Sequence, residues 1–282
     1  AIHPADYLAF LRDAWSEWID SGARGEIIAT CYPVPGLRRL RPENIDGKVG
    51  YYCHSAETAI TAGTWAAAQA SAACAMTAQR IVSAGARAAF ALCRPPGHHA
   101  HAALYGGYCF LNNAALAAEG FRRDGAARVA ILDVDFHHGN GTQDIFYDRD
   151  DVLFLSLHGA PEHAYPYFLG RADETGAGRG EGFTVNYPMP PGTPYGPWAQ
   201  ALDDALARIR AFGAEALVIS LGVDTFERDP ISFFRLTSPD FLDYGRRIGR
   251  LGLPTLFALE GGYAVEEIGV NVVNVLQGFE EA

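Results

Sequence analysis

Short apolar runs alternate with helix-like stretches along the 282-residue chain. Most of these runs are continuously apolar, which is typical of parallel strands that are covered on both faces. The predicted strands are 88–93, 128–134, 152–157, 183–187, 214–222 and 254–260. The predicted helices are 57–83, 112–123, 193–212, 238–251 and 265–279. The alternation predicts an α/β fold in which helices flank both faces of a mainly parallel sheet.

Two segments interrupt this alternation. Residues 30–50 are rich in Pro, Gly and Arg, and a connection of that length without regular structure is typical of functional or mobile loops. Residues 160–182 are Gly-rich and are also predicted to be irregular. No internal repeat or break in composition divides the chain, so we expect residues 1–282 to form one domain.

Charge and cysteine usage exclude several classes of partner and site. The net charge is −11, from 22 basic and 33 acidic residues, so nucleic acid is not an expected partner. Five cysteines without a Cys-x-x-Cys pair favour a reducing cytoplasm and argue against a Cys-rich zinc site, although a Cys31–Cys53 bridge stays open. No apolar run approaches the length of a membrane span and no signal-like start is present, so we expect no membrane partner and a cytoplasmic location.

Polar side chains gather directly after the predicted strands. Most of the nine histidines lie there, together with several aspartates and a tyrosine. In an open parallel sheet, ligands bind beyond the carboxyl ends of the strands. We therefore expect these side chains to share one functional edge of the sheet.

A metal site is predicted at the end of strand 128–134. At strand spacing Asp133, Asp135 and His137 point the same way, so Asp135 and His137 are able to reach one metal with Asp133 behind them. Asp224 arrives from another strand and completes the set. Two oxygens and one nitrogen leave coordination positions open, as in catalytic divalent sites. For an isolated Asp-x-His, a hydrogen-bond network at the strand end is the alternative.

Acid–base groups are predicted beside this site. His98 and His99 follow a Pro-Pro-Gly turn and are candidates for a general base and its electrostatic partner. Asp133 and Asn140 are the candidates to orient their rings. Tyr263 follows two glycines, so its phenol is able to reach a developing oxyanion, with a packed surface tyrosine as the alternative.

Together these residues resemble the arginase–deacetylase superfamily, and within it the histone deacetylase-like amidohydrolases. The resemblance runs through essentially the whole chain and is carried by RPPGHHA (94–100), YGGYCFLNN (105–113), ILDVDFHHGNGTQ (131–143), LSLH (155–158), LGVDTFERDP (221–230) and LEGGY (259–263). Asn140 and the Arg-Pro-Pro-Gly turn resemble the class II branch. The tail 260–279 and the segment ending IDGKVGYY are most similar to bacterial acetylpolyamine amidohydrolases.

The resemblance implies a metal-dependent catalytic centre. One zinc ion per chain, or Fe(II) in its place, would be held by Asp135, His137 and Asp224. His99 would act as general base and later as acid, and Tyr263 would polarise the acetyl carbonyl. The fold implied is the arginase–deacetylase fold, a mainly parallel sheet flanked by helices.

The resemblance also implies partners for the two histidines. Asp133 would hydrogen-bond to His98, which assists electrostatically, and Asn140 would hydrogen-bond to His99. A neutral asparagine stabilises an imidazolium less than a carboxylate does, so His99 is expected to be the weaker base of the pair.

Substrate and potassium sites follow from the same resemblance. The Gly107 carbonyl would accept the substrate amide N–H, and Tyr108 and Tyr165 would line a narrow tunnel for its aliphatic stem. A structural K⁺ would be held by oxygens of Asp133, Asp135, His137, Ser156 and Leu157.

The segment 30–50 corresponds to an insert at the rim of the active site that promotes a homodimer. Asp46 and Glu57 match acidic positions that meet the distal ammonium of the substrate, with solvated surface carboxylates as the alternative. The stretch from Ile2 to Leu8 normally follows a first strand and helix, so a β-α unit of the family is expected to be missing upstream.

We therefore expect a zinc-dependent deacetylase that hydrolyses acetylated polyamines, which are small cationic acetylated amines. A protein or peptide N-acetyl-lysine deacetylase is the alternative with the same catalytic centre. An arginase-type ureohydrolase fits less well, because it needs two manganese ions and further Asp ligands. A non-catalytic binder of acetylated ligands is the alternative outside enzymes.

Overall fold

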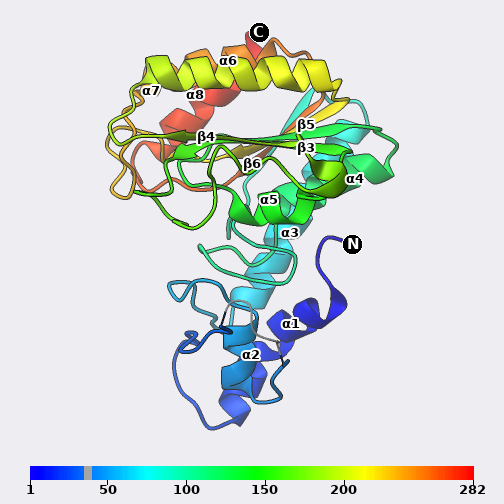
Figure 1. The fold of residues 1–282 in the computed structure, drawn as a ribbon, viewed down its shortest axis with the longest axis vertical. Coiled ribbons are helices and arrows are strands. Elements are labelled where there is room, and N and C mark those ends of the chain that lie inside the picture. The colour runs from blue at the N-terminus through cyan, green and yellow to red at the C-terminus, as the bar shows by residue number, and fades with distance from the viewer. Residues whose placement is uncertain (35–39) are drawn as a thin grey trace.

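The predicted parallel sheet is present in the computed structural model, which describes residues 1–34 and 40–282. Six strands, all paired in parallel, follow the order β1-β6-β5-β2-β3-β4 (Figure 1). Their bounds are β1 Ala88–Ala91, β2 Val129–Asp133, β3 Val152–Gly159, β4 Thr184–Met189, β5 Ala216–Leu221 and β6 Thr255–Leu259. Each strand overlaps a predicted run, so continuous apolarity was a correct signal for this sheet.

Helices cover both faces of the sheet. The predicted helices correspond to α3 Thr64–Ser83, α4 Asn113–Arg123, α6 Tyr195–Phe212, α7 Ser238–Gly249 and α8 Ile268–Glu280. Helices α6, α7 and α8 lie on one face, and α3, α4 and the short α5 (Asn140–Phe146) lie on the other (Figure 1). Alternate residues of the central strands face these two layers, as Leu132 and Ile131 of β2 do.

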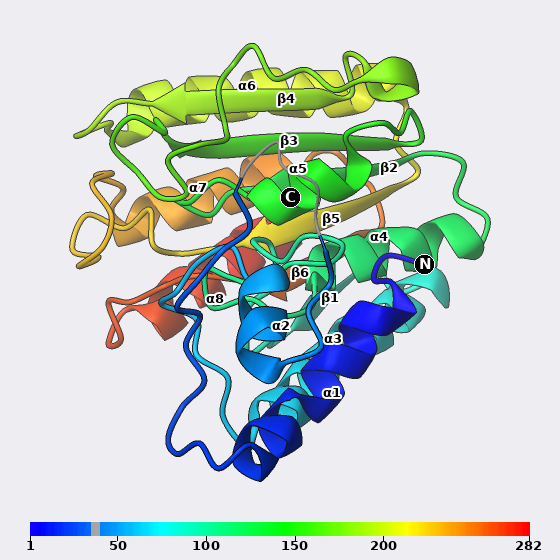
Figure 2. The same ribbon diagram turned by 60° about the horizontal axis from the view of Figure 1, so that its bottom comes forward.

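A smaller cluster of helices lies beside the carboxyl ends of the strands. It contains α1 (Ala5–Asp20) and α2 (Ile45–Tyr51), which pack against the start of α3 (Figure 2). The Tyr7 hydroxyl donates to the Phe110 carbonyl oxygen at 2.6 Å, which ties α1 to the loop after β1. The side chains of this cluster form an apolar core of their own, separate from the two apolar layers that cover the sheet.

The expectation of irregular structure in 30–50 is wrong in part, because α2 begins at Ile45. The Asn44 side chain accepts a hydrogen bond from the Asp46 N–H, and this cap starts the helix after a Pro-rich stretch. Residues 35–39 of this segment lie outside the described residues. The predicted helix 57–83 begins only at Thr64, because Ile60 pairs with Ile27 in a short bridge.

All five cysteines are free in the described structure, so the Cys31–Cys53 bridge is not formed. Across the described ranges, the structure holds no helix of the length and apolarity that a membrane crossing requires.

The sheet topology brings the polar strand ends together. Strands β2 and β5 are neighbours, with β3 and β4 on one side of this pair and β6 and β1 on the other. In an open α/β sheet the crevice for a ligand lies where the strand order reverses. Asp135 and Asp224 follow β2 and β5, so both lie at this position.

Candidate active site

Asp135, His137 and Asp224 form a buried cluster at the end of β2 and β5. One potential ligand atom of each lies within 4.8 Å of the others. The Nδ1 atom of His137 is 2.8 Å from Asp224 Oδ2 and 3.2 Å from Asp135 Oδ1. The structure thus brings together the three residues that the sequence selected as a metal-binding set.

Backbone amides hold these carboxylates in place. The Gly261 N–H donates to Asp135 Oδ2 at 2.7 Å, and the Phe136 N–H donates to Asp224 Oδ1 at 2.8 Å. A Cβ atom at Gly261 would lie 2.7 Å from an oxygen of each carboxylate, so only glycine permits this approach. The loop after β6 therefore closes around the carboxylates that β2 and β5 deliver.

The electrostatics of the cluster favour a cation. Burial and the charge of Asp135 raise the pKa of Asp224 to about 7. Burial opposes the charged form of His137, but its hydrogen bonds to Asp135 and Asp224 outweigh this and raise its pKa to about 9. Two buried carboxylates and one imidazole with this spacing fit a divalent metal, which neutralises the repulsion between the carboxylates.

His98 and His99 lie side by side next to this cluster, with their ring centroids 4.0 Å apart. His98 Nδ1 is 2.9 Å from Asp133 Oδ2, and His99 Nδ1 is 2.7 Å from Asn140 Oδ1. The rings thus have one carboxylate partner and one amide partner, as the resemblance implied. Because the carboxylate and the amide oxygen accept, each ring carries a proton on Nδ1.

The two imidazoles differ in charge preference. Burial opposes charge on His98, but the carboxylates of Asp133 and Asp135 raise its pKa well above the usual value. For His99, burial and then the charges of His98 and His137 lower the pKa well below the usual value. His99 is therefore the ring that is neutral and able to accept a proton at Nε2.

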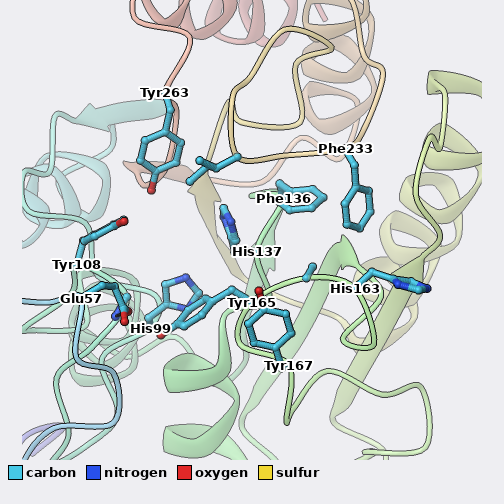
Figure 3. A pocket seen from close by; sticks show the side chains of 13 residues that line it. Glu57, His99, Tyr108, Phe136, His137, His163, Tyr165, Tyr167, Phe233 and Tyr263 are labelled. Atoms are coloured by element: carbon cyan, nitrogen blue, oxygen red, sulfur yellow. Dashed lines mark hydrogen bonds between the residues drawn. The ribbon is translucent and has the colours of Figure 1, made fainter.

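Tyr263 reaches the same cavity from the loop after β6. Figure 3 shows its hydroxyl directed toward the space between Tyr108 and His137. Its ring centroid lies 6.4 Å from that of His137 and 6.3 Å from that of Tyr108. Burial and nearby carboxylates raise the pKa of Tyr263, so the phenol keeps its proton and acts as a donor.

A cavity of about 280 Å³ connects these groups with solvent (Figure 3). Its lining consists of Glu57, His99, Gly107, Tyr108, Phe136, His137, His163, Ala164, Tyr165, Tyr167, Ile231, Phe233 and Tyr263. The lining is largely aromatic, and Glu57, His99, His137 and His163 are its carboxylate and imidazole side chains. Such a pocket accepts an aliphatic chain with a polar reacting group at its tip.

A strained turn forms one wall of this cavity. Gly107 and Tyr108 both adopt left-handed backbone conformations, with φ of 56° and 64°. The Thr58 hydroxyl accepts from the Tyr108 N–H at 2.8 Å, and Glu57 Oε1 accepts from the Gly107 N–H at 3.2 Å. A Cβ atom at Gly107 would overlap the His99 ring, so glycine is required where the turn passes the histidine.

The remaining predicted substrate residues differ in position. The Tyr165 ring meets His99 edge-on at a centroid distance of 4.9 Å and lines the cavity. Glu57 also lines the cavity, and its carboxylate accepts a hydrogen bond from the Ser55 hydroxyl. Asp46 lies on α2, exposed and outside the lining of this cavity.

The residues predicted to hold potassium are all buried and lie along the ends of β2 and β3. Asp133 pairs with Ser156 in the register of the sheet. The Asp133 carboxylate contacts His98 and the Asp135 N–H, and Ser156 Oγ lies 2.9 Å from His158 Nδ1.

Other side chains support the site without having been predicted. Asp229 Oδ2 accepts from the backbone N–H of Tyr263 at 2.8 Å and of Ala264 at 3.3 Å. Glu260 Oε2 accepts from the N–H groups of Gly97 and His98, at 2.6 and 3.1 Å. Both carboxylates lie inside motifs that carried the resemblance, but no spacing rule identifies a side chain that bonds to a distant backbone.

Comparison with known proteins agrees with this geometry. The sequence profile of the histone deacetylase domain matches residues 1–279. The chain is 60% identical over 277 residues to a Mycoplana ramosa protein named acetylpolyamine amidohydrolase, covering 98% of this chain and 81% of that protein. It is also 60% identical to acetylpolyamine amidohydrolase 1 of Pseudomonas aeruginosa, covering 100% of this chain and 82% of that one.

A solved structure has the same fold. The crystal structure of an acetylpolyamine aminohydrolase from Burkholderia pseudomallei superposes with a TM-score of 0.94 at 42% sequence identity. The match covers 99% of this chain and 81% of that one.

Proposed function

Because the chain belongs to the histone deacetylase domain family, we propose that it is a metal-dependent amidohydrolase that deacetylates acetylated polyamines. The observation that carries the proposal is the buried cluster of Asp135, His137 and Asp224 beside a cavity that also presents His99 and Tyr263. The relatives named acetylpolyamine amidohydrolase support the substrate class.

Each of these side chains has a separate role in the proposed reaction. Asp135, His137 and Asp224 would hold a divalent cation, which when bound would supply Lewis acidity at the acetyl carbonyl and the attacking water. Neutral His99 takes the proton of this water at Nε2 and later gives it to the leaving amine. The Tyr263 hydroxyl donates to the carbonyl oxygen as negative charge develops there.

The neighbouring groups orient the reactants. His98, kept charged by Asp133, stabilises the negative charge that gathers beside the cluster. The Gly107 carbonyl oxygen accepts the substrate amide N–H, and Tyr108 and Tyr165 enclose the aliphatic stem. A chain held between two aromatic rings presents its amide in one direction, which lowers the entropy lost on reaching the transition state.

The substrate's positive charge has a partner at the cavity. Glu57 is a carboxylate in the lining, and the Gly107 N–H that donates to it fixes its position. A distal ammonium extending from the cavity passes this side chain, which favours a cationic amine over a neutral amide. We assign Asp46 to the same role only in a homodimer, since within one chain it lies outside the cavity lining.

Zinc is the metal we propose, with Fe(II) as the alternative, since two oxygens and one nitrogen suit either ion. K⁺ is proposed for the oxygens of Asp133, Asp135, His137, Ser156 and Leu157. A homodimer formed around residues 30–50, and a reducing compartment consistent with the free thiols, complete the proposal.

The test is a substrate panel run on protein loaded with a defined metal. N-acetylputrescine, an acetyl-lysine peptide and a neutral N-acetylalkylamine are compared by kcat/KM. The proposal expects release of acetate with N-acetylputrescine preferred. A preference for the peptide would favour the N-acetyl-lysine deacetylase alternative, and absence of turnover with bound metal would contradict an enzymatic role.

A further inference from the structure

His101 is a buried histidine without a role in the proposed reaction, and it contacts Asn140, the hydrogen-bond partner of His99. His101 lies in the turn after β1, and its side chain is only 11% exposed. Two residues of α5, Asn140 and Asp144, contact its two ring nitrogens. They are four apart on this short helix, so both side chains lie on the face that meets His101.

The contact with Asp144 determines where the His101 proton lies. His101 Nδ1 is 3.0 Å from Asp144 Oδ2, and the Asp144 side chain is 55% exposed. The carboxylate oxygen accepts at this contact, so Nδ1 of His101 carries the proton. With the proton on Nδ1, the ring offers Nε2 as an acceptor, which requires a donor.

That requirement determines the direction of the Asn140 amide. His101 Nε2 lies 3.0 Å from Asn140 Nδ2, and an amide nitrogen only donates. The flipped amide would set its carbonyl oxygen against the lone pair of Nε2. A buried acceptor that faces another acceptor loses its hydrogen bond, so the flip is disfavoured.

The direction of Asn140 in turn determines the tautomer of His99. With Nδ2 at His101, the Asn140 carbonyl oxygen faces His99 Nδ1 at 2.7 Å. The His99 proton therefore lies on Nδ1, and Nε2 keeps the lone pair that a base needs. A flipped amide would donate to Nδ1 and favour the tautomer with its proton on Nε2. In that tautomer Nε2 has no free lone pair and is unable to accept a proton.

We propose that His101 and Asp144 are positioning residues that fix the direction of the Asn140 amide and thereby the tautomer of His99. The inference rests on the proposed function only in taking His99 as the base. Among the described residues, those lining the cavity beside the metal cluster include neither His101 nor Asp144, so both act through Asn140.

His54 packs against the same ring but has a different partner. Its ring centroid lies 5.0 Å from that of His101 in an edge-on arrangement. His54 Nε2 lies 3.1 Å from the carbonyl oxygen of His99, to which it donates. His54 therefore supports the backbone of His99, and the direction of Asn140 is left to His101.

The tautomer is directly measurable by nitrogen-15 NMR of labelled histidine in the zinc-loaded protein, with His99→Gln used for assignment. In the parent, we expect the His99 signals of a ring protonated on Nδ1 and free on Nε2. His101→Phe keeps a ring of similar size and removes the acceptor. We expect mixed His99 tautomers and a loss in kcat on the order of tenfold, with zinc content unchanged.

Repeating His101→Phe in the Asn140→Asp variant distinguishes a role of His101 in orienting Asn140 from a role in packing. In Asn140→Asp the carboxylate offers an oxygen to both histidines whichever way it turns, so the direction no longer depends on His101. Adding His101→Phe there is expected to cost less than about twofold in kcat, because the acceptor for His99 is already guaranteed. Equal losses in the two backgrounds would show a packing role and overturn the proposal.

Asp144→Asn and its control Asp148→Asn test the role of Asp144. Asp144→Asn weakens the preference for a proton on His101 Nδ1 and is expected to produce part of the His101→Phe effect on the His99 tautomer. Asp148→Asn removes an equal charge from an exposed position nearby and is expected to change nothing. An unchanged tautomer in Asp144→Asn and His101→Phe would overturn the inference. A parent without deacetylase activity would overturn the proposed function, and a tautomer response there would still support the inference.

Discussion

The backbone N–H of Tyr263 donates to the carboxylate of Asp229 at 2.8 Å, across 34 residues of sequence. The same oxygen accepts from the Ala264 N–H, and the other oxygen accepts from the Ile231 N–H. The loop that carries the proposed oxyanion donor is thus fixed by one buried side chain. The position of the Tyr263 hydroxyl depends on this bond as well as on the turn at Gly261 and Gly262.

Asp229→Asn is therefore expected to lower kcat by about tenfold with little change in KM, because a displaced donor costs transition-state stabilisation. The asparagine amide has only one oxygen acceptor, so its NH₂ group would face a backbone N–H that an Asp229 oxygen now accepts from. Steady-state kinetics at saturating metal test this. Asp240→Asn, which disrupts only the capping box of α7, is the matched control for stability. An unchanged kcat in Asp229→Asn would contradict a positioning role.

Tyr263→Phe is expected to lower kcat by about 10²–10³ while leaving the metal content intact. The phenol hydroxyl is the group removed, and the ring that packs beside Tyr108 stays. Metal analysis and single-turnover rates measure the two effects separately. Tyr167→Phe removes a hydroxyl from the same cavity and serves as control. Full activity of Tyr263→Phe would exclude the assigned role.

Asn140→Asp is expected to move the acid limb of the kcat–pH profile upward. Burial, together with the charges of His98 and His137, holds the pKa of His99 well below its usual value. The base works unprotonated, so activity is lost as the pH falls through this pKa. A carboxylate partner stabilises the imidazolium and raises the pKa by about one unit, so activity is lost at a higher pH. An acid limb that stays or moves downward would contradict the role of His99.

Glu57→Gln is expected to raise KM for N-acetylputrescine several-fold more than KM for a neutral N-acetylalkylamine, because only the first substrate carries an ammonium. The amide oxygen of the new side chain is able to accept the bond from the Gly107 N–H, so the turn is preserved. Asp46→Asn is the comparison, and a small effect is expected from its position outside the cavity lining. An equal loss for both substrates in Glu57→Gln would argue against selection by charge.

Removal of the metal by a chelator is expected to abolish activity and to lower the melting temperature by about 5–10 °C. Without a cation, the buried carboxylates of Asp135 and Asp224 repel each other, as the raised pKa of Asp224 indicates. Differential scanning calorimetry with and without added zinc measures the shift. The chelator is expected to have little effect on Asp224→Asn, and an equal shift in that variant would place the stabilising ion elsewhere.

The sheet was predictable because its strands are buried on both faces. Val129 to Leu132 of β2 are entirely buried, and such a strand appears in the sequence as a continuous apolar run. The helix α2 was not predicted, because Asn44 caps it within a segment dominated by Pro, Gly and Arg. The helix α1 was not predicted either, although Tyr7, Phe10, Leu11 and Ala14 recur at helical spacing and are buried.

The metal cluster and the histidine pair were predictable for a different reason. Parallel strands deliver whatever follows them to one edge, so Asp135, His137 and Asp224 were expected at the same edge, and the adjacency of β2 and β5 in the sheet brings them together. Their chemistry is set by residue type, and the resemblance to the deacetylases selected His99 over His98 as the base.

The sequence by itself therefore determined the layers of the fold, the edge that holds the site and the residue types that perform its chemistry. Only the tertiary structure decided that Glu57 lines the cavity while Asp46 does not, that Asp229 holds the Tyr263 loop, and that His101 meets Asn140. These are single hydrogen bonds and contacts between segments distant in sequence. They follow no helix or strand period, and their geometry exists only once the packed elements bring both partners together.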